Sequence, residues 1–224
     1  MEEYLIRVKL LKNAVFGSGY SVPGFIDSDV LYDDYGFPYI SGKTLKGKLG
    51  ETATVFVNMV QSVPELSRFG EMFRQKRDRI FGVADEYEHN TLKFSDCEMS
   101  KYVRDYFKAH MYGAGITPAE ILEALTHTET ATAMDYERGV AKENSLRSFR
   151  VINRGIILSA AITSPVELDE DERIILASAC SLLRHLGSFE TKGKGSAEVS
   201  LFYEGNNVTP DFIKLLDKKV KTSV

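Results

Sequence analysis

The chain has 224 residues, enough for one domain with a substantial hydrophobic core. Hydrophobic residues make up 43% and charged residues 27% of the sequence, values that exclude a disordered, collagen-like or coiled-coil protein. The net charge of −4 argues mildly against a nucleic-acid-binding protein. Basic residues nevertheless cluster at 43–48, 138–154 and 192–194, so a negative net charge would be compatible with nucleic-acid binding if the protein had an acidic face beside a basic groove.

The first part of the chain predicts a strand, a long loop and two helices. Residues 4–10 alternate between apolar and polar side chains, which is typical of a half-buried strand. Glycine and proline are dense over 17–42, which predicts a long, shaped loop in place of a helix. Apolar residues then recur every three or four positions from Thr44 until just before Pro64, and a second, more polar helix is predicted over 65–81.

The middle of the chain predicts short elements and a hairpin. Residues 92–94 indicate a short strand, and 118–125 a short helix. We interpret the polar stretch 127–150 as a β-hairpin that turns near Glu137–Gly139 and projects from the body. The nearly continuous apolar run over 156–162 is typical of a strand buried on both faces.

The last part of the chain predicts a second strand–helix–strand unit. A helix is predicted over 169–186, with acids at its start and leucines along one face. A glycine-rich turn over 187–195 leads into an alternating strand at 197–203, and a basic helix follows around 210–220.

Taken in order, these elements predict an α+β fold built on a ferredoxin-like, or RRM-like, sheet. We expect a single domain over 1–224 with insertions at about 64–126 and 127–150. The second insertion is the projecting hairpin, and a glycine-rich loop lies near the C-terminus.

No segment of the sequence predicts export or a membrane span. The chain starts with a charged, alternating segment, and no apolar stretch approaches the roughly 18 residues that a membrane helix needs. Cys97 and Cys180 lie far apart without a paired set of four ligands, so neither a disulfide framework nor a zinc site is expected. The cytoplasm is therefore the expected compartment.

Two glycine-containing segments have the composition of phosphate-binding sites. Gly42 stands just before a predicted helix whose first turn carries Lys43, Thr44 and Lys46, so that free backbone N–H groups and ammonium groups would meet a phosphate. The alternative is a solvated helix start. In the second segment, Lys192, Gly193, Lys194 and Gly195, glycine allows close approach to a phosphate and lysine neutralises it.

The predicted hairpin combines bases with apolar side chains that can wedge or stack against nucleobases. Such a combination favours sequence-independent RNA binding. The alternative is an exposed polar hairpin stabilised by pairs of glutamate and arginine. The candidate residues are Met134, Tyr136, Arg138, Lys142, Arg147, Phe149, Arg150 and Arg154.

Four groups of motifs follow one another along nearly the whole chain. They are FIDSDV at 25–30 with GFPYISGKTLKG at 36–47, RIFG at 79–82 with LKFSD at 92–96, TAMDYERGVAKEN at 132–144, and LGSFETKGKGSAEV at 186–199. Together and in this order, they resemble the RAMP (repeat-associated mysterious protein) family of type III CRISPR effectors.

The resemblance implies a subunit that stacks with others along a guide RNA and inserts its 127–150 hairpin, as a thumb, between guide and target. The implied partners are guide RNA (crRNA), complementary target RNA, and neighbouring copies or other RAMP subunits. Base pairing by the guide would supply the sequence specificity.

The resemblance also implies candidate catalytic residues. In catalytic members of the family, an aspartate in the loop after the first strand supports divalent-metal-dependent cutting of target RNA. Asp27 occupies the matching place and is the implied ligand of Mg²⁺ or Mn²⁺, and Asp29 is the second candidate. Many catalytic members carry proline where Asp29 stands, so the loop departs from that pattern. The alternative is that both aspartates only cap turns.

Two other functions remain open from the sequence. The first is a structural subunit that binds RNA without chemistry, which the same basic loops would support. The second is a metal-independent endonuclease acting on the CRISPR precursor transcript with histidine as general base. The candidate bases are His89, His110, His127 and His185, of which His127 would lie at the base of the hairpin.

Overall fold

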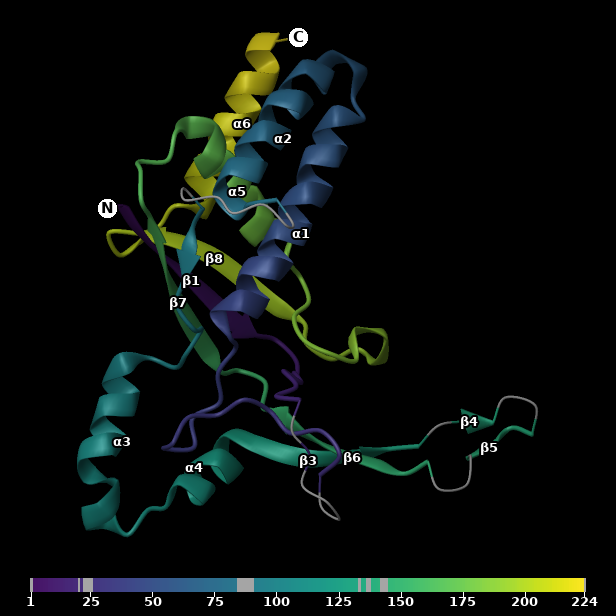
Figure 1. Cartoon of the computed structure of the whole chain (residues 1–224), viewed down its shortest axis with the longest axis vertical. Coiled ribbons are helices and arrows are strands. Elements are labelled where there is room, and N and C mark those ends of the chain that lie inside the picture. Colours follow the sequence, from purple (N-terminus) through teal and green to yellow (C-terminus); the bar gives the residue numbers. More distant parts are fainter. Residues whose placement is uncertain are drawn as a thin grey trace.

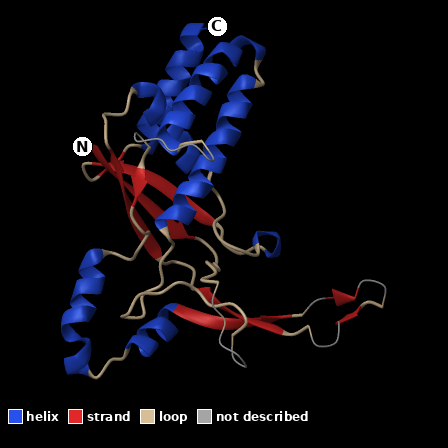
Figure 2. Ribbon diagram, viewed as in Figure 1, coloured by secondary structure: helices blue, strands red, loops and turns tan. Residues whose placement is uncertain are grey.

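The computed structural model describes residues 2–19, 21, 26–83, 91–132, 134–135, 138–141 and 145–223. Over these residues the fold is α+β, with six α-helices, a five-stranded antiparallel sheet and two smaller two-stranded sheets (Figure 2). The predicted α+β class is confirmed. None of the described helices is both long and apolar enough to cross a membrane.

The five-stranded sheet is built around the first strand of the chain, β1. This strand pairs antiparallel with β7 on one side and with β8 on the other, and two short strands extend the edges to give the order β2-β7-β1-β8-β9. The strands span Glu2–Leu10 (β1), Lys93–Phe94 (β2), Ile157–Ser164 (β7), Ala197–Tyr203 (β8) and Asn206–Asn207 (β9).

Two helices cover one face of this sheet, and two more pack against them (Figure 1). The inner pair is α1 (Gly42–Gln61) and α5 (Glu170–Leu182), and the outer pair is α2 (Ser67–Phe81) and α6 (Thr209–Ser223). The units β1-α1-β2 and β7-α5-β8, joined in the sheet order β2-β7-β1-β8, form the ferredoxin-like arrangement. Short 3₁₀ turns at Pro64–Leu66 and Glu190–Lys192 complete the helical elements.

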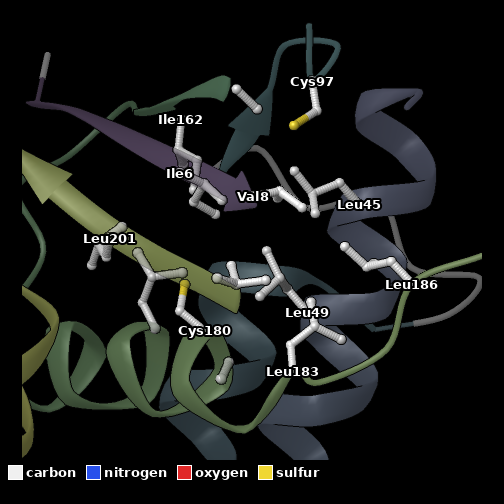
Figure 3. Close-up of a cluster of buried hydrophobic side chains, with 14 of the residues drawn as sticks. Ile6, Val8, Leu45, Leu49, Cys97, Ile162, Cys180, Leu183, Leu186 and Leu201 are labelled. Atoms are coloured by element: carbon white, nitrogen blue, oxygen red, sulfur yellow. The ribbon is translucent and has the colours of Figure 1, made fainter. Parts of the chain in front are cut away.

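The core lies between the sheet and the inner helices (Figure 3). Ile6 of β1 stands opposite Ala160 of β7 and Leu201 of β8, and it is completely buried. Leu45 and Leu49 of α1, one helical turn apart, are buried in the same cluster. This packing explains the periodicity from which α1 was predicted.

The strand β7 is buried on one face only, so the prediction of a strand buried on both faces is wrong. Leu158, Ala160 and Ile162 are buried, whereas Ile157 is 45% exposed. On the neighbouring strand, Leu5 is 37% exposed. The reason is that α1 and α5 cover a single face, and apolar residues on the other face of β7 reach solvent.

The helix α5 ends at Leu182, earlier than the predicted end at Leu186. Leu183 already has an extended conformation, with φ −73° and ψ 99°. Leu183 and Leu186 are nevertheless buried in the core. The apolar spacing that suggested a longer helix therefore comes partly from an extended segment that packs against the same core.

Two helices follow β2, and one of them was not predicted. The helix α4 (Pro118–Leu125) confirms the expected short helix, whereas α3 (Lys101–Ala114) occupies a region without a helix prediction. Its apolar residues face outward as well as inward: Tyr102 is 90% exposed and Met111 is buried. Gly115 ends α3 in the left-handed conformation, which accounts for the glycine-rich break.

The segment after α4 forms two antiparallel pairs that we call the arm. β3 (Thr126–Ala131) pairs with β6 (Arg147–Ile152), and β4 (Met134–Asp135) pairs with β5 (Val140–Ala141). In Figure 1, β3 and β6 run side by side away from the main sheet, and β4 and β5 lie beyond them. The strand pairing agrees with the predicted hairpin.

Acidic residues at the start of α5 connect three helices. Asp169 and Glu172 form a capping box, in which each side chain accepts a hydrogen bond from the backbone N–H of the other. Lys76 of α2 pairs with Asp169, and Arg79 of α2 pairs with the completely buried Glu172. Lys219 of α6 pairs with the two acids between them.

Replacing Arg79 should therefore destabilise the fold. We expect Arg79→Met to lower the free energy of unfolding by about 3 kcal/mol, because the buried Glu172 would lose its cation while the apolar packing is largely kept. Urea denaturation measures this change. The control Arg68→Met, exposed on the same helix, should shift it by less than about 0.5 kcal/mol. Equal effects of the two substitutions would contradict a structural role for the Arg79–Glu172 pair.

Candidate nucleic-acid interface

The loop after β1 is attached to the base of the arm by backbone pairing. The N–H of Asp27 donates to the carbonyl oxygen of Ser148 at 2.8 Å, and the N–H of Arg150 donates to the carbonyl oxygen of Ser28 at 3.0 Å. Ser28 also forms a parallel bridge with Phe149. The loop therefore runs beside β6 as a short additional strand and joins segments 121 positions apart.

The two candidate catalytic aspartates have different environments. Asp29 is 5% exposed, and its Oδ1 accepts hydrogen bonds from Arg150 Nε at 2.9 Å and from the N–H of Val30 at 2.8 Å. Asp27 is exposed, and its Oδ2 accepts from the N–H of Ser148 at 2.6 Å. Asp29 is thus part of a buried ion pair, whereas Asp27 is held at the surface by the arm.

Arg150, a predicted RNA contact, lies inside this junction. Its side chain is 17% exposed. Its guanidinium donates from Nε to Asp29, and from Nη1 to the hydroxyl oxygen of the buried Thr126 at 3.3 Å. These bonds connect the loop, β3 and β6. A contact of Arg150 with RNA stays a prediction.

The Asp29–Arg150 pair should contribute strongly to stability. We expect Asp29→Asn to lower the free energy of unfolding by about 3 kcal/mol, because a nearly buried guanidinium would lose its counter-charge. The matched control is Asp34→Asn, which makes the same change at an exposed position of the same loop. Urea denaturation compares the two variants. An Asp29→Asn protein as stable as the wild type would contradict this role.

The start of α1 differs from the predicted phosphate site in one respect. The N–H of Gly42 donates to Asp96 Oδ1 at 2.7 Å, and the N–H of Thr44 donates to the hydroxyl of Ser41 at 3.2 Å. The premise of free N–H groups at Gly42 and Thr44 is therefore wrong, because the protein caps its own helix. A Cβ at Gly42 would lie 2.6 Å from the carbonyl oxygen of Ser95, so glycine is needed for packing against β2.

The two lysines of this helix start also differ from each other. Lys46 Nζ donates to the carbonyl oxygen of Leu92 at 2.9 Å, and partial burial lowers the pKa of Lys46. Lys43 is exposed. Of the predicted RNA contacts here, Lys43 therefore has the most accessible charge, and RNA binding by all four residues stays a prediction.

A basic pocket is formed where three distant segments meet. It has a volume of about 350 Å³ and is lined by Lys12, Asn13, Arg154, Lys192, Gly193 and Lys194. Lys12 and Asn13 follow β1, Arg154 lies in the turn between β6 and β7, and the others belong to the loop after α5. Lys12 and Asn13 were not predicted as site residues, since their one signal in the sequence is their place just after the first strand.

Glycine is required in the loop that forms one wall of this pocket. Gly195 has φ +73°, and a Cβ there would lie 2.0 Å from the carbonyl oxygen of Leu186. The N–H of Gly195 donates to the carbonyl oxygen of Asn13 at 2.8 Å, which fastens the loop to the end of β1. The glycines thus bring the lysines of this loop next to Lys12.

The cations of the pocket are unequally accessible. Lys12, Arg154 and Lys192 are exposed. The side chain of Lys194 is 15% exposed, and its Nζ donates to both carboxylate oxygens of Glu129 on β3, at 2.6 and 2.8 Å. The bond from Lys194 is the main cause that lowers the pKa of the Glu129 carboxyl.

An aromatic stack joins the same loop to the arm. The rings of Phe149 on β6 and Phe189 are stacked, with centroids 4.7 Å apart and an interplanar angle of 27°. Phe189 has φ +63°, which is unusual for a residue with a side chain and indicates that surrounding contacts hold it. Lys192 lies over the ring of Phe189 at 5.3 Å. The predicted stacking residue Phe149 is thus buried and used within the protein.

The predicted RNA contacts on the outer arm are only partly described. Arg138 lies in the turn between β4 and β5, and Arg147 begins β6; both are exposed. Met134 lies in β4, and Tyr136 and Lys142 lie outside the described residues.

The residues near Asp27 fit a metal ion only if RNA supplies further ligands. Among the described residues, no group of three or more histidine, cysteine or acidic side chains is arranged to hold a metal ion. Mg²⁺ is commonly held by one or two carboxylates together with substrate phosphates and water. The exposed carboxylate of Asp27 fits that mode, whereas Asp29 is occupied by Arg150.

The histidines proposed as general bases do not cluster with Asp27 through any described bond. His127 Nδ1 lies 2.6 Å from Asn153 Oδ1, and its Nε2 lies 3.3 Å from Glu129. His110 stacks on Tyr106 of α3, and His185 lies 3.4 Å from Glu190. His89 is outside the described residues.

The sequence model of the RAMP superfamily matches residues 7–198, which include the second half of β1, both inner helices and the glycine-containing loop. The chain belongs to the RAMP superfamily. No curated protein sequence matches it.

Solved structures agree with a RAMP fold. One similar chain comes from the cryo-EM structure of a Type III-B Cmr-beta bound to cognate target RNA, with a TM-score of 0.62 and 15% identity over 95% of this chain and 99% of that one. A chain from the cryo-EM structure of the apo state of a Type III-B Cmr-beta has the same TM-score and identity, over 92% of this chain and 99% of that one. At this identity the likeness concerns the fold.

Proposed function

We propose that this RAMP protein is a subunit of a type III CRISPR ribonucleoprotein that binds the backbone of guide RNA and positions complementary target RNA. The observation that carries the proposal is the basic pocket, which is lined by the exposed cations Lys12, Arg154 and Lys192 and has a glycine-containing loop as one wall. The family membership and the fold likeness to a complex bound to target RNA support it.

The chemistry of the pocket favours phosphate over bases as the contacted group. Lysine and arginine neutralise phosphates whatever the base sequence, and glycine lets the RNA backbone come close. The exposed Lys43 at the start of α1 would add a further phosphate contact. Specificity would come from the pairing of guide with target.

The arm is proposed to act as the thumb that lies between guide and target RNA. Arg138 and Arg147 would contact phosphates, and Met134 and Tyr136 would wedge or stack against bases, together with Lys142. The loop of Lys192–Gly195 is the proposed C-terminal glycine-rich RNA contact. The partners would be guide RNA, target RNA and adjacent RAMP subunits in the cytoplasm.

We further propose that the subunit cuts target RNA and that Asp27 is its catalytic carboxylate. Asp27 is exposed and oriented by Ser148 at the base of the proposed thumb, whereas Asp29 is buried against Arg150. Asp27 would hold Mg²⁺ or Mn²⁺ with phosphate oxygens of the RNA. The ion would supply charge neutralisation and activation of the attacking 2′-hydroxyl.

Removing two pocket cations should weaken RNA binding. We expect Lys12→Gln/Arg154→Gln to raise the Kd for guide RNA and to lower the slope of log K against log salt by about 1.4, since each lost single-strand phosphate contact removes about 0.7. The control Lys101→Gln/Lys214→Gln removes two exposed cations elsewhere. Equal loss of affinity in both double variants would contradict a specific role of the pocket.

Cleavage by the guide-loaded complex tests the proposed catalytic residue. We expect Asp27→Asn to abolish Mg²⁺-dependent cuts at regular spacing while target binding persists, because the amide keeps the bond from Ser148 but loses the charge. The control Asp34→Asn should cut normally. Normal cutting by Asp27→Asn would contradict the catalytic role and favour a structural subunit that binds RNA without chemistry. Cutting that survives EDTA would favour the metal-independent alternative with a histidine base.

A further inference from the structure

Glu129 is an acidic residue that faces the basic pocket from the arm. It lies on β3, and its carboxylate accepts from Lys194 Nζ through both oxygens. Asn13, another lining residue of the pocket, donates from Nδ2 to Glu129 Oε1 at 3.4 Å, and His127 Nε2 lies 3.3 Å from the same oxygen. The carboxylate thus contacts two of the groups that line the proposed phosphate site.

The Glu129 carboxylate binds Lys194 in the way that another anion, such as a phosphate, would bind it. An ammonium group has three N–H donors, and two bonds from Lys194 end on the carboxylate. The glycine-containing loop brings this same ammonium group to the pocket, so a phosphate there and the Glu129 carboxylate would compete for its charge and for its N–H donors. The side chain of Lys194 is only 15% exposed, so in this arrangement little of it is open to solvent.

We propose that Glu129 competes with RNA phosphate for Lys194 and so sets the affinity of the pocket for nucleic acid. This inference rests on the proposed binding of RNA in the pocket. In the free protein, Lys12, Arg154 and Lys192 carry the accessible positive charge, and Lys194 joins them when a phosphate displaces the carboxylate. Weakly binding anions would leave the Lys194–Glu129 pair intact.

The competition also connects RNA binding to the arm. Glu129 belongs to β3 of the arm, and Lys194 belongs to the loop after α5. Displacement would therefore remove one link between loop and arm, while the Phe149–Phe189 stack would keep a second. RNA in the pocket would loosen the arm locally without detaching it.

Glu129→Gln separates this competition from simple charge removal. We expect the variant to bind fluorescent oligouridine about 3- to 10-fold more tightly than the wild type, because one partly buried ion pair no longer has to be broken. The slope of log K against log salt should steepen by about 0.7, the value of one further phosphate contact. In the wild type, the Lys194–phosphate pair replaces the Lys194–Glu129 pair, so the contact with Lys194 adds little to the salt dependence of binding.

Two comparisons make the experiment decisive. Glu123→Gln removes the same charge from an exposed position on α4 and should leave the salt slope unchanged. In a Lys194→Gln background, Glu129→Gln should no longer steepen the slope, because the ammonium group is absent. Weaker binding by Glu129→Gln, or an unchanged slope in the presence of Lys194, would overturn the inference and assign Glu129 the role of positioning Lys194.

The same titrations distinguish this inference from the proposed function. If Lys12→Gln/Arg154→Gln weakens binding while Glu129→Gln has no effect, RNA binding in the pocket stands and the competition is rejected. If the Lys12→Gln/Arg154→Gln protein binds like the wild type, the pocket is not the RNA site, and both proposals are overturned.

Discussion

The attachment of the first loop to the arm is the constraint on which the proposed site depends. Asp29 and Arg150 form a nearly buried ion pair between segments that are far apart in sequence. Removing either partner would leave a buried charge uncompensated, which is far more costly than losing a surface pair. The backbone pairing around them presents Asp27 next to Ser148. The position of the proposed catalytic carboxylate is thereby fixed relative to the proposed thumb.

The negative net charge of the chain is compatible with RNA binding because of where the charges lie. Several acids are paired with bases of the protein itself, where the start of α5 meets α2 and α6. The accessible cations Lys12, Arg154 and Lys192 gather at one pocket. Long-range attraction to RNA would therefore be modest, and binding would depend on a few close contacts and on neighbouring subunits.

The sequence was sufficient for the core elements and insufficient for contacts between distant residues. β1, α1 and β8 have strong periodicity, because each buries one face against the same core. The helix α3 escaped prediction since exposed tyrosines such as Tyr102 obscure its pattern. The one-sided burial of β7 depends on which face the helices cover, which no local pattern reveals.

The candidate site was also predictable only in part, because local sequence patterns do not reveal contacts between distant residues. Lys192 and Gly193 carried a local signal, and the structure brings them to the pocket. The partnership of Arg150 with Asp29, of Lys194 with Glu129, and of Gly42 with Asp96 arises from tertiary packing. Lys12 and Asn13 have no distinguishing pattern in the sequence, and they become part of the pocket because the loop of Lys192–Gly195 packs next to them.

Chemical crosslinking of guide RNA to nearby lysines in the loaded complex with a bifunctional reagent, followed by mass spectrometry, tests the central claim most directly. If guide RNA lies in the basic pocket, crosslinked peptides should include residues 12–13 and 192–194, and Lys12→Gln/Arg154→Gln should reduce their yield. Crosslinks confined to the outer helices α2 and α6 would contradict binding in the pocket.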